Sequence, residues 1–417
     1  MSRSTVPSSE HSGAPHWQGP RWSLVLLLAA MGMLGPFSVD AYLPAFASIG
    51  AELRATPAQM QQTLSALFLA WAVMNLFHGA LADSLGRRPV VLGGIAVFTL
   101  ASIGCALSQT LGQLVFFRVM QGLAIGVGNV VSRAVIRDLF EHANAQRLMS
   151  QVAIIHGLAP VLAALIGGYL YAHFGWRSIF WLLTALVATL GWATWRLLPE
   201  TLRPAQIQPL RLAALMHGYR VMLSDARVTL LALGNALPFC GAFVYVLSAP
   251  HFMGEHLGLA PTQFYWLFVM MVSGLIGGAF VSGRLAGRVT PARQIHLAQA
   301  IMLAAALCNL LAAWLFKAHA AWSLFPIGLF TFGWALAMPS LTLLLLDLHP
   351  ERRGMASSLQ SCAASACIGL VSGLLIPLVL HSTLLMALCM LGFALCGIAL
   401  WALIARTWPE AGKTMAH

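Results

Sequence analysis

The 417-residue sequence is 59% hydrophobic and only 8% charged, and its formal net charge at pH 7 is +11. A soluble globular domain carries roughly 25% charged residues, so a water-soluble fold of this length could not cover its own surface, and a lipid bilayer is the expected solvent. The basic residues flank apolar runs instead of gathering in one patch, which argues against a nucleic-acid partner.

Residues 1–20 are polar and rich in Ser, Pro and Gly, which predicts a disordered cytoplasmic tail. From Trp22 onward, apolar runs alternate with short polar breaks, and each run is long enough to cross a hydrocarbon core of about 30 Å as a helix. The longest polar interval, 199–227, predicts a cytoplasmic linker. The sequence therefore predicts an all-α membrane protein with twelve transmembrane helices in two six-helix halves, 21–198 and 228–405, and a cytoplasmic tail at 406–417. The predicted spans are 22–48, 59–82, 89–107, 111–132, 149–171, 177–198, 228–250, 262–283, 295–316, 322–346, 355–379 and 382–405.

The distribution of lysine and arginine predicts the orientation, because these residues are enriched in cytoplasmic loops. If the N-terminus is inside, nineteen of the 23 basic residues fall on the inner side and three, Arg54, Arg177 and Lys317, fall on the outer side. The remaining one, Arg118, lies within a span. Both termini are therefore predicted to be cytoplasmic.

A weak internal repeat supports the division into halves. Gly79-Ala-Leu-Ala-Asp83 follows the second span, and Gly283-Arg-Leu-Ala-Gly287 follows the eighth, 204 residues later. Two six-helix halves related by an axis along the membrane normal are a known plan of transporters.

Asp40 and Arg118 are the two charged residues well inside the predicted spans. A charge near the bilayer centre costs at least about 2.5–3.5 kcal/mol, so each is a candidate functional residue. A carboxyl group in an apolar cavity binds a proton more readily than one in water, which predicts a proton-coupling role for Asp40. The alternative is that Asp40 caps a kinked helix before Pro44. Arg118 is predicted to bind substrate, to influence Asp40, or to order the helix packing alone.

Other polar and aromatic side chains in the spans are candidates for the wall of a substrate cavity. A polar group in a span more often makes an interhelical hydrogen bond than it binds a ligand. Aromatic rings can form a pocket for flat organic molecules. The candidate cavity residues are Arg118, Phe37, Tyr42, Asn75, Asn129, His156, Phe239, Tyr245 and Trp266.

The fifth span contains helix breakers, Gly157 and Pro160, followed by Gly167 and Gly168. Proline removes a backbone hydrogen bond, and glycine permits bending or close helix approach. This helix is therefore predicted to take part in conformational change.

Several motifs resemble those of the major facilitator superfamily. Gly79-Ala-Leu-Ala-Asp83-Ser-Leu-Gly86-Arg87-Arg88-Pro is similar to its signature loop between helices two and three, and Arg118-Val-Met-Gln121-Gly122 is similar to the arginine motif of helix four. Gly157 to Gly168 resembles the antiporter motif of helix five, with Ala159 in place of the usual glycine. Ser38-Val-Asp40-Ala-Tyr42-Leu-Pro44-Ala and Arg137-Asp138-Leu-Phe resemble the bicyclomycin and chloramphenicol resistance (Bcr/CflA) subfamily of drug:proton antiporters.

This resemblance implies a multi-pass transporter of the bacterial inner membrane that exports drugs or other small organic molecules by alternating access, driven by protons. Asp40 would bind the proton or a cationic drug, and Arg118 would lie near it in a central cavity. Gly287 stands where Asp83 would align in the second half, so a matching second lock is not expected. A monomer can house this mechanism, with substrate, protons and lipid as its partners. The implied conformational gate comprises Gly79, Asp83, Gly86, Arg87, Arg88, Gly157 and Pro160.

Two other functions remain open at this stage. A narrow-specificity transporter of a natural metabolite, such as a nucleoside, amino acid or sugar, would share the fold. A membrane enzyme would need clustered catalytic residues at the membrane face, whereas the charged stretch from Arg137 to His142 is more simply a cytoplasmic loop. The sequence has no G-x-x-x-x-G-K-[ST] motif for a nucleotide, and its seven cysteines lack the spacing of a zinc or disulfide site. We therefore expect no enzyme activity, cofactor or metal.

Overall fold

The structure is a computed structural model that describes residues 17, 20–140, 142–204 and 207–408. The predicted tails at 1–20 and 406–417 lie almost entirely outside these ranges. The described residues form helices and connecting turns, with no strand among them.

The first half contains one element for most predicted spans and several for the first two. Its elements are α1 (Arg21–Gly32), α2 (Leu34–Asp40), η1 (Leu43–Ala45), α3 (Phe46–Glu52), α4 (Pro57–Asn75), α5 (His78–Leu85), α6 (Arg87–Leu107), α7 (Leu111–Leu139), α8 (His142–Phe174) and α9 (Arg177–Leu197).

The second half follows the same plan after a connecting helix, α10 (Leu212–Ser224), in the predicted linker. Short 3-10 or wide helical turns, labelled η, interrupt it. Its elements are α11 (Ala226–Leu247), η3 (Pro250–His256), η4 (Pro261–Gln263), α12 (Tyr265–Leu285), α13 (Pro291–Leu315), α14 (Ala320–Ser323), α15 (Phe325–Leu348), η5 (Pro350–Arg352), α16 (Arg353–Leu370), η6 (Val371–Leu375), α17 (Ile376–Val379) and α18 (Thr383–Thr407).

Ten helices of the described chain are long and apolar enough to cross a bilayer, and two bent helix pairs raise the number to twelve if each pair crosses once. The prediction of an all-helical multi-pass membrane protein is confirmed.

The first predicted span, 22–48, is not one helix, and this prediction was wrong in detail. The chain bends by 44° between α1 and the segment Leu34–Glu52, and α2 ends at Asp40. Pro44 explains the second interruption, because its nitrogen cannot donate to the preceding turn and its ring restricts the residue before it.

The second predicted span, 59–82, is also broken. Helix α4 ends at Asn75, and α5 starts at His78 after a bend of 49°. A capping box at Thr56 and Gln59 fixes the start of α4, because each side chain accepts a hydrogen bond from the other residue's backbone amide.

Glycines allow the helices of each half to touch backbone to backbone. A β-carbon at Gly122 on α7 would overlap the carbonyl of Leu67 on α4, and one at Gly128 would overlap the carbonyl of Met31 on α1. Gly274 and Gly278 on α12 approach α15 in the same way. Such small residues are the usual means of close packing between membrane helices.

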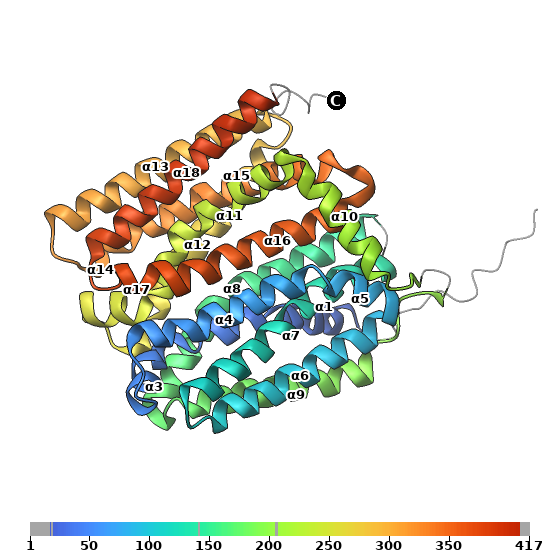
Figure 1. The fold of residues 1–417 in the computed structure, drawn as a ribbon, viewed down its shortest axis with the longest axis horizontal. Helices are drawn as coiled ribbons and strands as arrows, with labels where there is room; N and C mark the ends of the chain where they lie inside the picture. The colour runs from blue at the N-terminus through green and yellow to red at the C-terminus, as the bar shows by residue number, and fades with distance from the viewer. Residues whose placement is uncertain (1–16, 18–19, 141, 205–206, 409–417) are drawn as a thin grey trace, which may run out of the picture.

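Figure 1 shows the two halves side by side, with their long helices running in roughly the same direction. Helices α4 and α16 pack against each other along the boundary between the halves. We call the end with the start of α1, the end of α18 and helix α10 the termini end. The opposite end, with α3 and α14, is the far end.

Candidate functional site

Asp40 is the last residue of α2 and is only 5% exposed. Among the described residues it has neither a hydrogen bond nor an ion pair. Successive helical residues are rotated by about 100°, so Asp40 points about 200° away from Ser38, whose side chain faces α7. The carboxyl group is therefore buried on the side of α2 that does not face α7.

Arg118 on α7 is fully buried and is held by uncharged groups. Its Nη1 donates to the Ser38 carbonyl at 2.8 Å, to Ser38 Oγ at 3.0 Å and to Gln121 Oε1 at 3.0 Å. Its guanidinium lies over the ring of Tyr42, 4.3 Å from the ring centre. Nε and Nη2 have no hydrogen-bond partner in the described chain. Arg118 thus binds the residue two places before Asp40 and makes no ion pair with Asp40 itself.

The breakers of the fifth span lie on α8, which contains Pro160 within its helix. Gly167 packs so closely on Ala41, next to Asp40, that a β-carbon there would overlap the Ala41 backbone. Gly168 lies against Pro261 of the second half, where a β-carbon would be 2.6 Å from the Pro261 carbonyl oxygen. No heavy atom would lie within 4 Å of a β-carbon at Gly157. Helix α8 therefore touches both the Asp40 segment and the second half near the far end.

The two halves are joined at the far end by side-chain hydrogen bonds. Gln61 Nε2 donates to the Leu247 carbonyl at 2.9 Å, and Ser65 Oγ donates to the Gly369 carbonyl at 2.7 Å. Ser372 Oγ donates to Gln61 Oε1 at 2.9 Å. These contacts close the far end of the boundary.

The termini end is hollowed between α7 and α8. A cavity of about 760 Å³ opens there. This volume is in the range of small-molecule sites. It is lined by Arg137, Phe140, Ala145, Gln146, Met149, Ser150 and Ala153.

The predicted polar cavity residues fall into two places. Asn75 crosses the boundary and donates to the Ser361 carbonyl and to Ser365 Oγ, both at 3.2 Å. Asn129 and His156 flank Gly32, where a β-carbon would lie 3.0 Å from Asn129 Oδ1 and from His156 Nδ1. Asn75 joins the halves, whereas Asn129 and His156 lie together inside the first half.

The predicted aromatic residues are dispersed. Tyr42 is buried under Arg118, and its hydroxyl lies 3.0 Å from Thr63 Oγ1. Tyr245 is buried in the second half, where Asn309 donates to its hydroxyl. Phe37 is half-buried and Trp266 is exposed.

Phe239 belongs to a row of aromatic rings that crosses from one half to the other. Its ring centre lies 4.4 Å from Trp334 and 5.0 Å from Phe243. Phe243 lies 6.0 Å from Phe68 of the first half, which stacks on Trp71 at 5.8 Å. Sequence reasoning missed four of these five rings, because nothing in the spacing of the sequence pairs α4 with α11.

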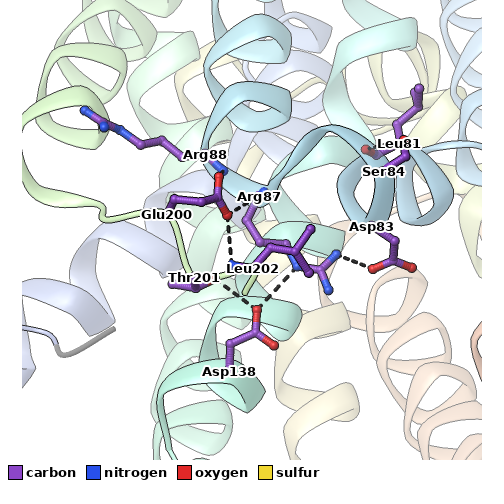
Figure 2. A network of polar contacts seen from close by, with 9 residues as sticks. All are labelled: Leu81, Asp83, Ser84, Arg87, Arg88, Asp138, Glu200, Thr201 and Leu202. Atoms are coloured by element: carbon purple, nitrogen blue, oxygen red, sulfur yellow. Dashed lines mark hydrogen bonds and ion pairs between the residues drawn. The ribbon is translucent and has the colours of Figure 1, made fainter. Parts of the chain in front are cut away.

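Of the predicted gate residues, Gly157 and Pro160 lie on α8, and the others lie in α5, in the turn after it or at the start of α6. Figure 2 shows Asp83, Arg87 and Arg88 at the α5–α6 turn. Gly86 makes the turn with φ of 99°, a left-handed conformation that favours glycine. Arg87 pairs with Asp83, and its Nε lies 3.4 Å from Asp138 Oδ2 at the end of α7. Gly79 on α5 has no neighbouring heavy atom where a β-carbon would lie.

Glu200, which follows α9, completes this network, and sequence reasoning missed it. Its carboxylate accepts hydrogen bonds from the backbone amides of Arg87 at 2.9 Å and Arg88 at 3.1 Å (Figure 2). It caps the start of α6, where a negative charge is favoured. Thr201 Oγ1 donates to Asp138 at 2.9 Å. The network therefore ties α5, α6, α7 and the segment after α9 together.

The corresponding turn of the second half has no such network. Gly287 adopts φ of 73°. Among the described residues, Arg284 and Arg288 on either side of it make no ion pair, and Arg284 lies over the ring of Phe280.

This arrangement defines a class of protein, a helical membrane transporter fold with two halves, a buried carboxyl group that has no partner in the described chain, and a cavity at one end. The sequence profile of the Major Facilitator Superfamily matches residues 28–373, and the chain belongs to this family.

Named relatives agree with the family. The chain is 29% identical to a bicyclomycin resistance protein homolog of Haemophilus influenzae over 66% of this chain and 70% of the relative. It is 28% identical to multidrug resistance protein D of Escherichia coli over 95% and 97% of the two chains. These relatives confirm the similarity to the bicyclomycin and chloramphenicol resistance subfamily.

Solved structures share the fold. A D-xylose–proton symporter superimposes with a TM-score of 0.70 at 15% identity, covering 91% of this chain and 97% of that one. At this identity the likeness concerns the fold alone.

Proposed function

We propose that this protein is a proton-coupled transporter that exports drugs or other small organic molecules across the bacterial inner membrane. The observation that carries the proposal is the Asp40 carboxyl group, which is 5% exposed and has no partner in the described chain. A buried group without a fixed counter-charge can exist with or without a proton at a modest difference in free energy. The names of the relatives favour drug export over a dedicated metabolite carrier.

The mechanism that we propose is alternating access. In the present conformation the far end is closed by the Gln61 and Ser65 hydrogen bonds, and the termini end has the cavity beside Arg137. Substrate enters from the termini end, which the arginine distribution assigns to the cytoplasm. Rocking of the halves then opens the far end, where Asp40 takes a proton from outside as substrate leaves. One chain contains all these parts, so we propose a monomer.

The gate residues and the aromatic row have distinct parts in this proposal. The Asp83–Arg87–Asp138 network would hold the termini-end segments of the first half as one unit while the halves rock. The row from Trp71 to Trp334 would supply flat apolar surface to aromatic drugs at the boundary. Arg118 would fix α2, and with it Asp40, against α7.

Proton movement in everted membrane vesicles tests the proposal. After a pH gradient is established, a substrate such as chloramphenicol should release protons from vesicles with the native protein. Asp40→Asn should abolish the response. The matched control is Asp347→Asn, the same chemical change at an exposed residue paired with Arg353, which should respond as the native protein does. A response that survives in Asp40→Asn would remove Asp40 from the coupling, and no response to any drug would overturn drug export.

A further inference from the structure

Two arginines lie on one face of α7 at the termini end, and one of them, Arg137, lines the cavity. Arg133 and Arg137 are four residues apart, and Asn129 is four residues before them, so the three side chains share one face of the helix at steps of about 6 Å. Arg137 lines the cavity, and Arg133 is exposed one helical turn before it on α7, farther from the termini end. The enrichment of arginine in cytoplasmic loops accounts for a charge at a helix end, but Arg133 lies six residues, or about 9 Å, before the end of α7.

The described chain places no counter-charge beside these arginines. Arg133 Nε donates to the Asn129 carbonyl at 3.2 Å, and the rest of its guanidinium makes no hydrogen bond to a described residue. Asp138 follows Arg137 in the chain, but its carboxylate is bound by Arg87 and Thr201 instead. Cations in a cleft with low-dielectric walls concentrate a positive potential there.

The remaining walls suit the rest of an organic molecule. Phe140, Met149 and Ala153 offer apolar surface, and Gln146 and Ser150 offer hydrogen bonds. The imidazole of His156, deeper on α8, lies beside Asn129. A guanidinium presents a planar set of donors that matches a carboxylate. The cavity thus combines an apolar wall with a cationic one.

We propose that this cavity binds organic anions, namely an aromatic or aliphatic body that carries a carboxylate, and that it selects against lipophilic cations. The inference rests on the proposed function only in taking the cavity as the substrate entrance. It names the charge of the preferred substrate, which the fold alone does not.

The anion site is separate from the proton site. Asn129 is level with Gly32, Arg133 is one turn nearer the termini end, and Asp40 is eight residues nearer the far end. At 1.5 Å per residue, Arg133 and Asp40 are about 18 Å apart along the helices. A carboxylate at Arg133 is therefore too distant to compete directly with the proton on Asp40, and the rocking of the halves must carry the coupling.

Equilibrium dialysis of the purified full-length protein, without a proton gradient, tests this proposal. The probes are radiolabelled 2-naphthylacetate, 2-naphthylmethanol and (2-naphthylmethyl)trimethylammonium, which share one ring system and differ in charge. The native protein should bind the anion at least tenfold more tightly than the cation. Added salt should weaken binding of the anion more than binding of the alcohol.

The variants distinguish a binding role from a structural one. Arg133→Gln with Arg137→Gln should weaken anion binding at least tenfold and change binding of the alcohol less than twofold, which also shows that the variant is folded. Arg133→Lys should retain most of the anion affinity, and Arg133→Glu should favour the cation. Arg220→Gln, at an exposed arginine of α10 outside the cavity, is the matched control and should bind as the native protein does.

Equal affinity for the three probes, no binding of any probe, or an unchanged anion affinity in the double glutamine variant would overturn the proposal. Anion binding together with a failure of the vesicle experiment would leave the cavity assignment standing and remove proton-coupled export. A positive vesicle experiment without preferential anion binding would leave proton-coupled export standing and remove the cavity assignment.

Discussion

Arg118 shows at the scale of one residue how a charge is accommodated inside the membrane domain. Within the described chain the guanidinium has no carboxylate partner, and the Ser38 carbonyl, Gln121 and the Tyr42 ring surround it instead. Burying a charge without an ionic partner costs desolvation free energy, and even buried ion pairs can often be replaced by apolar side chains of similar volume with little loss of stability. We therefore propose that Arg118 has a role in transport beyond its contribution to packing.

Two substitutions separate these contributions. Arg118→Met keeps most of the volume and removes the charge, so the free energy of unfolding should stay within about 1 kcal/mol of the native value. Arg118→Ala leaves a cavity and should cost about 2–4 kcal/mol. Thermal unfolding in detergent measures both. Transport should fail in both variants, and a Met variant that is strongly destabilised would show that Arg118 is chiefly structural.

Asp40 and Glu200 mark what the sequence predicts about single residues and what it does not. An acid in an apolar run stands out without any structure, and Asp40 is 5% exposed with no partner among the described residues. Glu200 stands in a polar segment, where an acid is unremarkable, and its role depends on the return of the chain from α9 to the start of α6. Only the packing of distant elements reveals a cap of that kind.

At the scale of elements, α10 is the least expected feature. It lies within the predicted linker and bridges the halves at the termini end. Tyr219 Oη donates to the Leu76 carbonyl of the first half at 2.8 Å, and Gly218 lies against Met355 of the second half. Rocking of the halves has to change at least one of these contacts.

Removal of one hydroxyl group tests the docking of α10. Tyr219→Phe deletes a hydrogen bond worth about 1 kcal/mol, so amide hydrogen exchange of 212–224 should accelerate roughly fivefold while exchange in α7 stays unchanged. Tyr169→Phe, at an exposed tyrosine of α8, is the matched control. Unchanged exchange in α10 would show that the buried Met222 and Gly218 contacts alone hold the helix.

The breaks in the first two spans show why element boundaries were only partly predictable. Hydropathy identifies a span by its length in lipid, and all the apolar runs are helical. It does not register where a helix bends. Pro44 gave a local signal for the end of α2, whereas the break between Asn75 and His78 contains neither proline nor glycine and lies where α4 packs against α7 and α16. The sequence therefore predicts that these segments are helical, whereas the position of the second bend became visible only in the structure.

At the scale of the whole molecule, the closed far end and the hollow termini end correspond to one of the two conformations of an alternating-access transporter. The repeat at Gly79 and Gly283 predicted two halves. The α5–α6 turn of the first half has the acids Asp83 and Asp138 beside Arg87, whereas the corresponding α12–α13 turn has no acid beside its arginines among the described residues. The two halves thus share a fold, but the ion-pair network is present at the turn of the first half and, within the described chain, not at the corresponding turn of the second half. At the termini end the network ties α5, α6, α7 and the segment after α9 together, and at the far end hydrogen bonds join the two halves.

A cross-link at the far end tests whether that end opens. A β-carbon at Gly373 would lie 3.2 Å from the Ser65 β-carbon, a little less than the roughly 3.5–4.5 Å between the β-carbons of a disulfide, so a small backbone shift would accommodate the bond. Ser65→Cys with Gly373→Cys, in a background without the seven native cysteines, should form a disulfide under mild oxidation, stop transport, and regain transport on reduction. An added Ala153→Cys should remain reactive to a thiol reagent while the far end is locked, because the cavity lies at the termini end. Ser65→Cys alone should transport with and without oxidant, and full transport by the cross-linked protein would mean that the substrate leaves without separation of α4 from η6.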